Sequence, residues 1–220
     1  MKPRLVTGTG VVLRVGKAGE GGRLLRLFSA TEGQISCFVS KGTLKKYGPG
    51  FLFPYAHLRY TLAVSPESRM LVQYEGRLLL DMTTKSYEEI AQWYYAAEIA
   101  MIAFPEGTAD EDVFYALETA AAEASRKNPT LVAFILAIRL LALAGFDPAE
   151  EDPMQSYGLS EETKALLLAF RRYDGRGKLS VPVTKANFRA CAEYIDAFAE
   201  RTAGLEMKTK GAFLELAISN

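Results

Sequence analysis

The sequence changes character near residue 80, and this change restricts how the chain can fold more than any other feature. Eleven of the 18 glycines lie before residue 81, in a segment rich in Val, Leu, Phe and Tyr with frequent turn residues. The remainder is rich in Ala, Leu and Glu, which lose little side-chain freedom in a helix. The sequence therefore predicts an α+β protein, with a β domain over 1–80 and an all-α domain over 81–220.

The formal charge divides at the same point. Residues 1–80 hold 12 Lys and Arg against four Glu, a net charge of +8, and the remainder carries −8 because the whole chain is neutral. A charge of this size attracts polyanions, and an acidic domain does not cancel its local field beyond a Debye length of about 8–10 Å. We therefore expect the basic segment to bind a partner.

Alternating apolar residues and turn residues predict five strands in the basic segment. Their approximate bounds are 4–15, 23–30, 34–41, 53–64 and 69–80. A helical turn over 43–47 is predicted between the third and fourth strands, before glycines at 48 and 50 end it. Five short antiparallel strands with a break after the third match the plan of an OB-fold barrel.

Such barrels bind single strands when a basic groove is interleaved with aromatic side chains. The candidate DNA-binding residues are Arg14, Lys17, Arg23, Arg26, Lys41, Lys45, Lys46 and Tyr47. A single Lys on a strand is usually only a solubilising edge residue, but the summed charge of +8 is harder to explain in that way. The aromatic residues expected to fill the barrel core are Phe28, Phe38, Phe51, Phe53 and Tyr60.

Helix signals dominate the acidic segment. The predicted helix starts are Ser86, Asp110, Asn128, Ser160 and Thr184. The helix after Asn128 is apolar on nearly every face and should occupy the centre of a bundle. Arg139 is the exception on that helix, and its charge must be paired or must reach water. Arg139 could form a structural ion pair or extend to the surface, or it could bind an acidic peptide, and the sequence does not decide between these roles.

The sequence offers little for catalysis. His57 is the sole histidine, so catalytic triads and multi-histidine metal sites cannot form within one chain except around it. Cys37 and Cys191 are too far apart for a local metal motif, and two thiols without an export signal suggest a reducing compartment. The longest apolar run is short for a membrane span. We expect a cytoplasmic binding protein, not an enzyme, with no metal or cofactor and no membrane partner.

Three strings carry a family resemblance through their order and spacing. They are LLRLFSATEGQIS at 24–36, IRLLALAGFDP at 138–148 and KTKGAFL at 208–214. Together they resemble the bacterial recombination mediator family RecO, over nearly the whole chain. Many members carry a four-cysteine zinc module soon after the second string, whereas residues 147–183 contain no cysteine. The resemblance is therefore to the zinc-free type.

This resemblance implies a non-enzymatic role in recombinational DNA repair. The family binds ssDNA and dsDNA, anneals complementary strands, and with RecR helps to load RecA onto ssDNA coated by single-strand-binding protein (SSB). It also implies a location at the nucleoid. Arg126, Lys127 and Arg139 are the candidates to receive the acidic tail of SSB, because a guanidinium fork fits a carboxylate.

Two other functions stay open. An RNA-binding factor of translation or ribosome assembly would use the same OB-fold barrel, and a preference for RNA in competition would support it. A metal-dependent nuclease could use the acidic runs at 110–112 and 150–152, and divalent-cation-dependent strand scission would reveal it. Acidic residues at helix starts and in loops need no metal to explain them.

Overall fold

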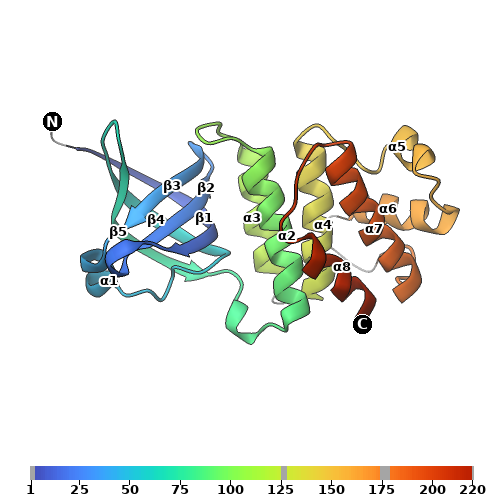
Figure 1. The fold of residues 1–220 in the computed structure, drawn as a ribbon, viewed down its shortest axis with the longest axis horizontal. Coiled ribbons are helices and arrows are strands. Elements are labelled where there is room, and N and C mark those ends of the chain that lie inside the picture. The colour runs from blue at the N-terminus through green and yellow to red at the C-terminus, as the bar shows by residue number, and fades with distance from the viewer. Residues whose placement is uncertain (1–2, 125–127, 174–178, 220) are drawn as a thin grey trace. The chain divides into compact units, whose positions relative to one another are not determined.

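The structure is a computed structural model that describes residues 3–124, 128–173 and 179–219, with side chains up to Leu214 in the last helix. Its contacts divide the chain into two compact units (Figure 1). The first unit comprises residues 1–84 and 104–125, and the second comprises residues 85–103 and 126–220. Within the described ranges, no helix combines the length and the hydropathy needed to cross a membrane.

A five-stranded sheet forms most of the first unit, as the sequence predicted. Its strands are β1 (Arg4–Lys17), β2 (Arg23–Ser29), β3 (Gly33–Val39), β4 (Ala56–Val64) and β5 (Arg69–Leu78). They pair in the order β1-β2-β3-β5-β4, and β4 pairs back onto β1, so the sheet closes into a barrel. Only β3 and β5 run parallel, and the other pairs are antiparallel.

Strand alternation places one face of the sheet inside the barrel. The inward residues include Val12, Leu25, Leu27, Ile35, Cys37, Val39, Leu58, Leu62 and Leu71, all buried in one cluster. A bulge between Val12 and Arg14 leaves Leu13 without its own partner on β2. The bulge puts Arg14 opposite Arg26, on the outer face of the sheet. The register of this hairpin therefore decides where its charges lie.

Several predicted strand boundaries differ from the structure by one to three residues, and two of these differences have a clear local cause. The third strand ends at Val39 because Ser40 begins α1 (Lys41–Tyr47), where its Oγ accepts a hydrogen bond of 3.0 Å from the backbone N–H of Thr43. The fourth strand begins only at Ala56, because the backbone of Tyr55 adopts a positive φ of 60°. Helix α1 lies at one end of the barrel and packs against β5 (Figure 1).

A helix also belongs to the first unit. This helix, α3 (Glu111–Glu123), begins at Asp110, whose carboxylate accepts a 3.0 Å hydrogen bond from the N–H of Val113. The segment before it joins β3, where Glu106 bridges to Gly33 and Gln34. The compact unit thus extends beyond the segment 1–80, and independent folding of 1–80 and 81–220 stays a prediction.

Helices form the second unit. They are α2 (Tyr87–Ala103), α4 (Pro129–Leu143), α5 (Glu151–Ser156), α6 (Glu161–Arg172), α7 (Lys185–Arg201) and α8 (Lys210–Ser219). Two short 3-10 turns, η1 (Gly19–Gly21) and η2 (Met82–Thr84), belong to the first unit. The predicted capping box is confirmed, since Ser86 N–H donates to Glu89 Oε2 at 2.8 Å and Glu89 N–H donates to Ser86 Oγ at 3.2 Å. The predicted caps Asn128, Ser160 and Thr184 also accept hydrogen bonds at their helix starts.

The central position predicted for the third helix is confirmed. Helix α4 packs against α2, α6 and α7, and its side chains from Val132 to Ile138 are buried. Helix α2 packs against both α4 and α8, and residues on most of its faces are buried. Tyr94 is an exception, since it is 37% exposed.

Helix α8 was not predicted from the sequence. The carboxylate of Glu98 on α2 accepts hydrogen bonds from the N–H groups of Lys208 and Thr209, at 3.1 and 2.9 Å. The ring of Phe213 stacks on Tyr95 with a centroid separation of 3.9 Å. A distant glutamate therefore holds the two residues that precede this helix, and no local sequence pattern reveals this contact.

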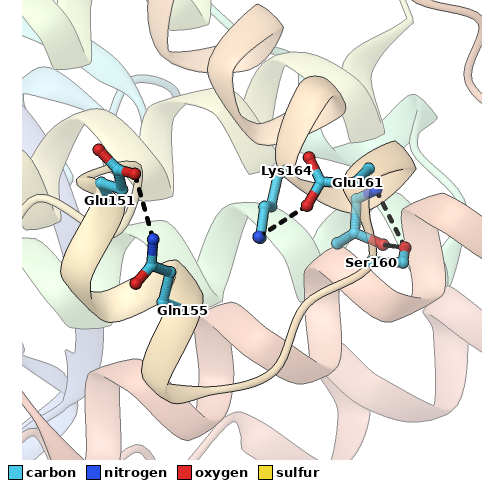
Figure 2. A network of polar contacts seen from close by, with 6 residues as sticks. Glu151, Gln155, Ser160, Glu161 and Lys164 are labelled. Atoms are coloured by element: carbon cyan, nitrogen blue, oxygen red, sulfur yellow. Dashed lines mark hydrogen bonds and ion pairs between the residues drawn. The ribbon is translucent and has the colours of Figure 1, made fainter.

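The described part of 147–183 contains α5 and α6 and makes several polar contacts. Figure 2 shows Glu151 accepting a hydrogen bond from Gln155 at 3.1 Å, and the ion pair between Lys164 and Glu161 at 2.8 Å. The hydroxyl of Tyr194 on α7 donates to the carbonyl of Pro148 at 2.6 Å. The two contacts in Figure 2 lie within single helices, whereas the Tyr194 bond ties the start of this segment to α7.

Candidate nucleic-acid interface

The first compact unit carries much less net charge than residues 1–80. Asp81 and six acidic residues within 104–125 bring its total to 12 Lys and Arg against 11 Asp and Glu, a net charge of +1. Net charge therefore does not identify a binding surface on this unit. The positions of the individual charges identify such a surface better, because an exposed charge acts only over about a Debye length.

One part of the barrel has balanced charges. Glu118 of α3 lies 3.2 Å from Nδ1 of His57 and 3.4 Å from Nη2 of Arg77, while Glu75 lies 3.3 Å from Nη1 of Arg59. These β4 and β5 side chains line a hollow of about 300 Å³. Since each cation there has a carboxylate partner, this region offers little attraction for an anion.

Another part of the barrel has cations without such partners. Seven of the predicted residues make no ion pair with any carboxylate in the described part of the chain. They are Arg14, Lys17, Arg23 and Arg26 on β1 and β2, and Lys41, Lys45 and Lys46 on α1. We refer to these seven residues as the cationic strip.

The hairpin half of the cationic strip consists of two like-charged pairs. Arg14 lies directly opposite Arg26, and Lys17 lies directly opposite Arg23. Residues opposite each other in an antiparallel pair have Cβ atoms about 4.5–5.5 Å apart, and like charges there destabilise the sheet. The fold therefore holds these cations together against their repulsion.

Helix α1 continues the strip from the hairpin. Arg23 pairs with Val39 at the end of β3, and only Ser40 separates Val39 from Lys41. A Cβ atom added at Gly21 would lie 3.6 Å from Cδ of Lys41, so the Lys41 side chain lies beside the connection between β1 and β2. Lys45 and Lys46 follow in the last turn of α1, where cations also favour the helix dipole.

Tyr47 has a packing role in the structure. Its half-buried ring lies 5.5 Å from the ring of Tyr74, and Nζ of Lys46 lies 5.0 Å from its centroid. Tyr47 therefore packs against the barrel core and anchors α1 there. Base stacking on Tyr47 stays a prediction.

The expected aromatic core is partly wrong. Tyr60 is buried in the barrel core, as predicted. Phe28 is buried instead on the outer face of β2, where the centroid of its ring lies 6.1 Å from that of Phe104. Phe51 and Phe53 are 37% and 39% exposed because they lie in the irregular segment before β4. Phe38 is half-buried on the outer face of β3, opposite Leu24. The alternation of Ile35, Cys37 and Val39 was the signal that could have placed Phe38 outside.

The candidates in the helical unit are only partly described. Arg126 and Lys127 lie outside the described residues. Arg139 is half-buried, and its Nη2 donates a 3.3 Å hydrogen bond to the carbonyl of Tyr173, the C-cap of α6. Arg139 makes no ion pair with a described carboxylate. Its hydrogen bond instead directs the guanidinium to the C-terminal end of α6, which is the negative end of that helix dipole.

The groups that could suggest catalysis have structural explanations. Burial raises the pKa of Cys37 and of Cys191 to about 12, so both thiols stay protonated at neutral pH and are poor nucleophiles. His57 contacts Glu118, and Asp110 caps α3. The acidic run at 110–112 therefore serves the start of a helix.

The comparisons with known proteins agree with this picture. Clustered Lys and Arg on a small barrel are typical of nucleic-acid-binding domains. No protein-family profile matches the chain. A curated relative named DNA repair protein RecO, from Pelotomaculum thermopropionicum, is 28% identical over 151 residues. The match confirms the resemblance to RecO found in the sequence, and it covers 67% of this chain but only 58% of the relative.

The Arg14–Arg26 pair yields a stability prediction. Arg26→Glu replaces a cross-strand repulsion with an attraction, so we expect the free energy of unfolding in urea to rise by about 0.2–1 kcal/mol. Arg4→Glu is the control, because Arg4 lies opposite the uncharged Val64 and should change stability little. Equal shifts in the two variants would contradict a close Arg14–Arg26 pair.

Proposed function

We propose that this protein is a recombinational DNA repair mediator of the RecO type. In this proposal it binds ssDNA and dsDNA, anneals complementary strands, and with RecR helps to load RecA onto SSB-coated ssDNA in the cytoplasm. The observation that carries the proposal is the cationic strip, seven basic residues without carboxylate partners among the described residues of one barrel. The similarity to a protein named DNA repair protein RecO supports it.

We also infer that the barrel is an OB-fold. Its strand order, β1-β2-β3-β5-β4, and the helix α1 between β3 and β4 support this assignment. OB-folds are five-stranded Greek-key barrels that bind oligonucleotides through the face of strands 2 and 3 and the adjoining loops. The cationic strip lies next to that face, since it includes Arg23 and Arg26 on β2.

Annealing requires two phosphate backbones to approach each other, and their repulsion is the main electrostatic obstacle. Lys and Arg that contact phosphates release condensed counterions and screen this repulsion. A row of cations that is not neutralised by the protein can do so at little desolvation cost, because its exposed members remain in water until DNA arrives. The strip is therefore suited to hold a strand without reading its sequence.

Reversing the charges on α1 tests this proposal. Lys41→Glu combined with Lys45→Glu and Lys46→Glu should weaken oligonucleotide binding at least about tenfold near 100 mM salt. The slope of log K against log salt should also fall, by roughly 0.7–0.9 for every phosphate that the variant no longer neutralises. Thermal stability should change little, since all three side chains are exposed. Fluorescence anisotropy across about 50–200 mM salt measures both the affinity and the slope.

A matched control separates strip effects from overall charge. Lys185, Arg201 and Lys208 are exposed residues of the helical unit, and their triple change to Glu alters the net charge of the protein equally. If both triple variants lose the same affinity, the strip has no special role. A stronger affinity of the parent protein for RNA than for DNA would instead favour an RNA-binding factor.

The helical unit is the proposed site for the acidic, aromatic-ended tail of SSB. Arg139 supports this part of the proposal because its guanidinium carries five N–H donors and bonds one backbone carbonyl, at the end of α6. A carboxylate fits the guanidinium fork in a bidentate way. Arg126 and Lys127, which precede α4 in sequence, complete the proposed site.

Binding of a fluorescent peptide with an acidic stretch and a C-terminal aromatic residue tests Arg139. Arg139→Gln keeps an N–H donor for Tyr173 but removes the charge, so we expect about tenfold weaker binding. Arg201→Gln, an exposed arginine at the end of α7, is the control and should bind like the parent. Unchanged binding by Arg139→Gln would exclude Arg139 from the peptide site.

A further inference from the structure

We propose that Leu24 and Phe38 form a stacking platform for unpaired nucleobases, so that this barrel binds a single strand more tightly than a duplex. This inference rests on the proposed function, because it assumes that the adjacent cationic strip holds the phosphate backbone. It adds a ligand, the unpaired base, and a site that no charge pattern identifies.

The platform lies on the outer face of β2 and β3. Leu25 and Leu27 on β2, like Cys37 and Val39 on β3, point into the core. Their neighbours Leu24 and Phe38 therefore point outward, and they lie directly opposite each other in the sheet. Leu24 is 47% exposed and Phe38 is half-buried. Two apolar side chains are thus presented to solvent side by side.

Gly22 supports the ring of Phe38. A Cβ atom at position 22 would lie 2.6 Å from Cε2 and Cζ of Phe38, closer than side chains approach each other in proteins. The ring occupies the space that a side chain at Gly22 would need. Phe38 is therefore held in place before any ligand binds, which reduces the entropy cost of stacking a base on it.

Cations surround this apolar pair. Arg26 follows Leu24 on the same face of β2, about 7 Å further along the strand, and Arg14 lies opposite Arg26. Arg23, which precedes Leu24, belongs to the opposite face of β2 at the end of the strand, and Lys41 lies beside the connection between β1 and β2. A base stacked on Phe38 would leave its phosphates within reach of Arg14 and Arg26. Basic grooves with stacking aromatics bind single strands in this way.

The platform discriminates between nucleic acids because only an unpaired base exposes its flat face. Stacking on an aromatic side chain contributes about 1–3 kcal/mol per base, equal to about a 5- to 150-fold change in affinity, and it tolerates every base. In a duplex the faces of the bases are already stacked on one another. The cationic strip contacts phosphates in both forms and does not involve the faces of the bases, so Phe38 should affect only the single strand.

Other exposed aromatic residues of the unit fit less well. Tyr115, which is 55% exposed, lies on α3 among acidic residues, and the half-buried Tyr47 is engaged by Tyr74 and Lys46. Phe51 and Phe53, which are 37% and 39% exposed, lie in the irregular segment before β4 and not on the β2–β3 face. As a cross-strand pair, Leu24 and Phe38 also stabilise the sheet. If this pair had only a structural role, replacing Phe38 would change the affinities for single-stranded and double-stranded DNA by the same factor.

The test compares Phe38→Ala, Phe38→Tyr and Tyr115→Ala. Affinities for a single-stranded oligonucleotide of about 15 nucleotides, which spans one OB-fold site, and for the duplex of the same length are measured by fluorescence anisotropy at one salt concentration. Phe38→Ala should bind the single strand about tenfold more weakly and the duplex within about twofold of the parent. Phe38→Tyr, which keeps a stacking ring, and Tyr115→Ala should resemble the parent. Leu24→Ala, at an exposed position, gives a smaller loss in the same direction and serves if Phe38→Ala unfolds.

The outcomes separate this inference from the proposed function. If the parent binds DNA through the strip but Phe38→Ala and Leu24→Ala weaken single-strand and duplex binding equally, or weaken neither, the platform is wrong and the strip remains. If the parent shows no salt-dependent DNA binding, the proposed function fails and the platform fails with it. A loss of binding to a partner protein, with ssDNA binding unchanged, would assign the apolar pair to a protein contact and overturn the inference.

Discussion

The repulsion between Arg14 and Arg26, and between Lys17 and Arg23, is the constraint from which the proposed binding mode follows. Both pairs are fixed by the register of β1 and β2, and the bulge after Val12 determines that register. The inward residues of the same strands are buried, so the hydrophobic core holds the cations in place. A protein selected only for stability would not keep like charges opposite each other, and an anionic ligand would relieve their repulsion.

The acidic residues of the first unit define where such a ligand can bind. Glu118 on α3 bridges His57 and Arg77, and Glu75 pairs with Arg59, so β4 and β5 have balanced charges. No described carboxylate pairs with the cationic strip. A unit with a net charge of only +1 therefore keeps the cationic strip without carboxylate partners among its described residues, while Glu118 of α3 balances cations on β4 and β5.

Much of the fold follows from local patterns in the sequence. The five strands come from alternation and turns, and the caps at Ser86, Asp110, Asn128 and Ser160 come from short polar side chains before apolar repeats. Nonlocal features were not predictable in this way. The cap of α8 by Glu98, the grouping of α3 with the barrel and the bulge at Leu13 all depend on contacts between segments distant in sequence. The predicted site residues were chosen for their charge and one aromatic ring, and their contact with DNA stays a prediction; this choice missed the outward position of Phe38.

Lysine footprinting shows whether the cationic strip contacts DNA. The parent protein is treated with an amine-acetylating reagent, with and without a single-stranded oligonucleotide, and the modified lysines are quantified by mass spectrometry. We predict that Lys17, Lys41, Lys45 and Lys46 lose reactivity when DNA is bound, while the exposed Lys185 and Lys208 of the helical unit keep theirs. Unchanged reactivity of the four strip lysines, or protection confined to Lys185 and Lys208, would contradict this binding mode.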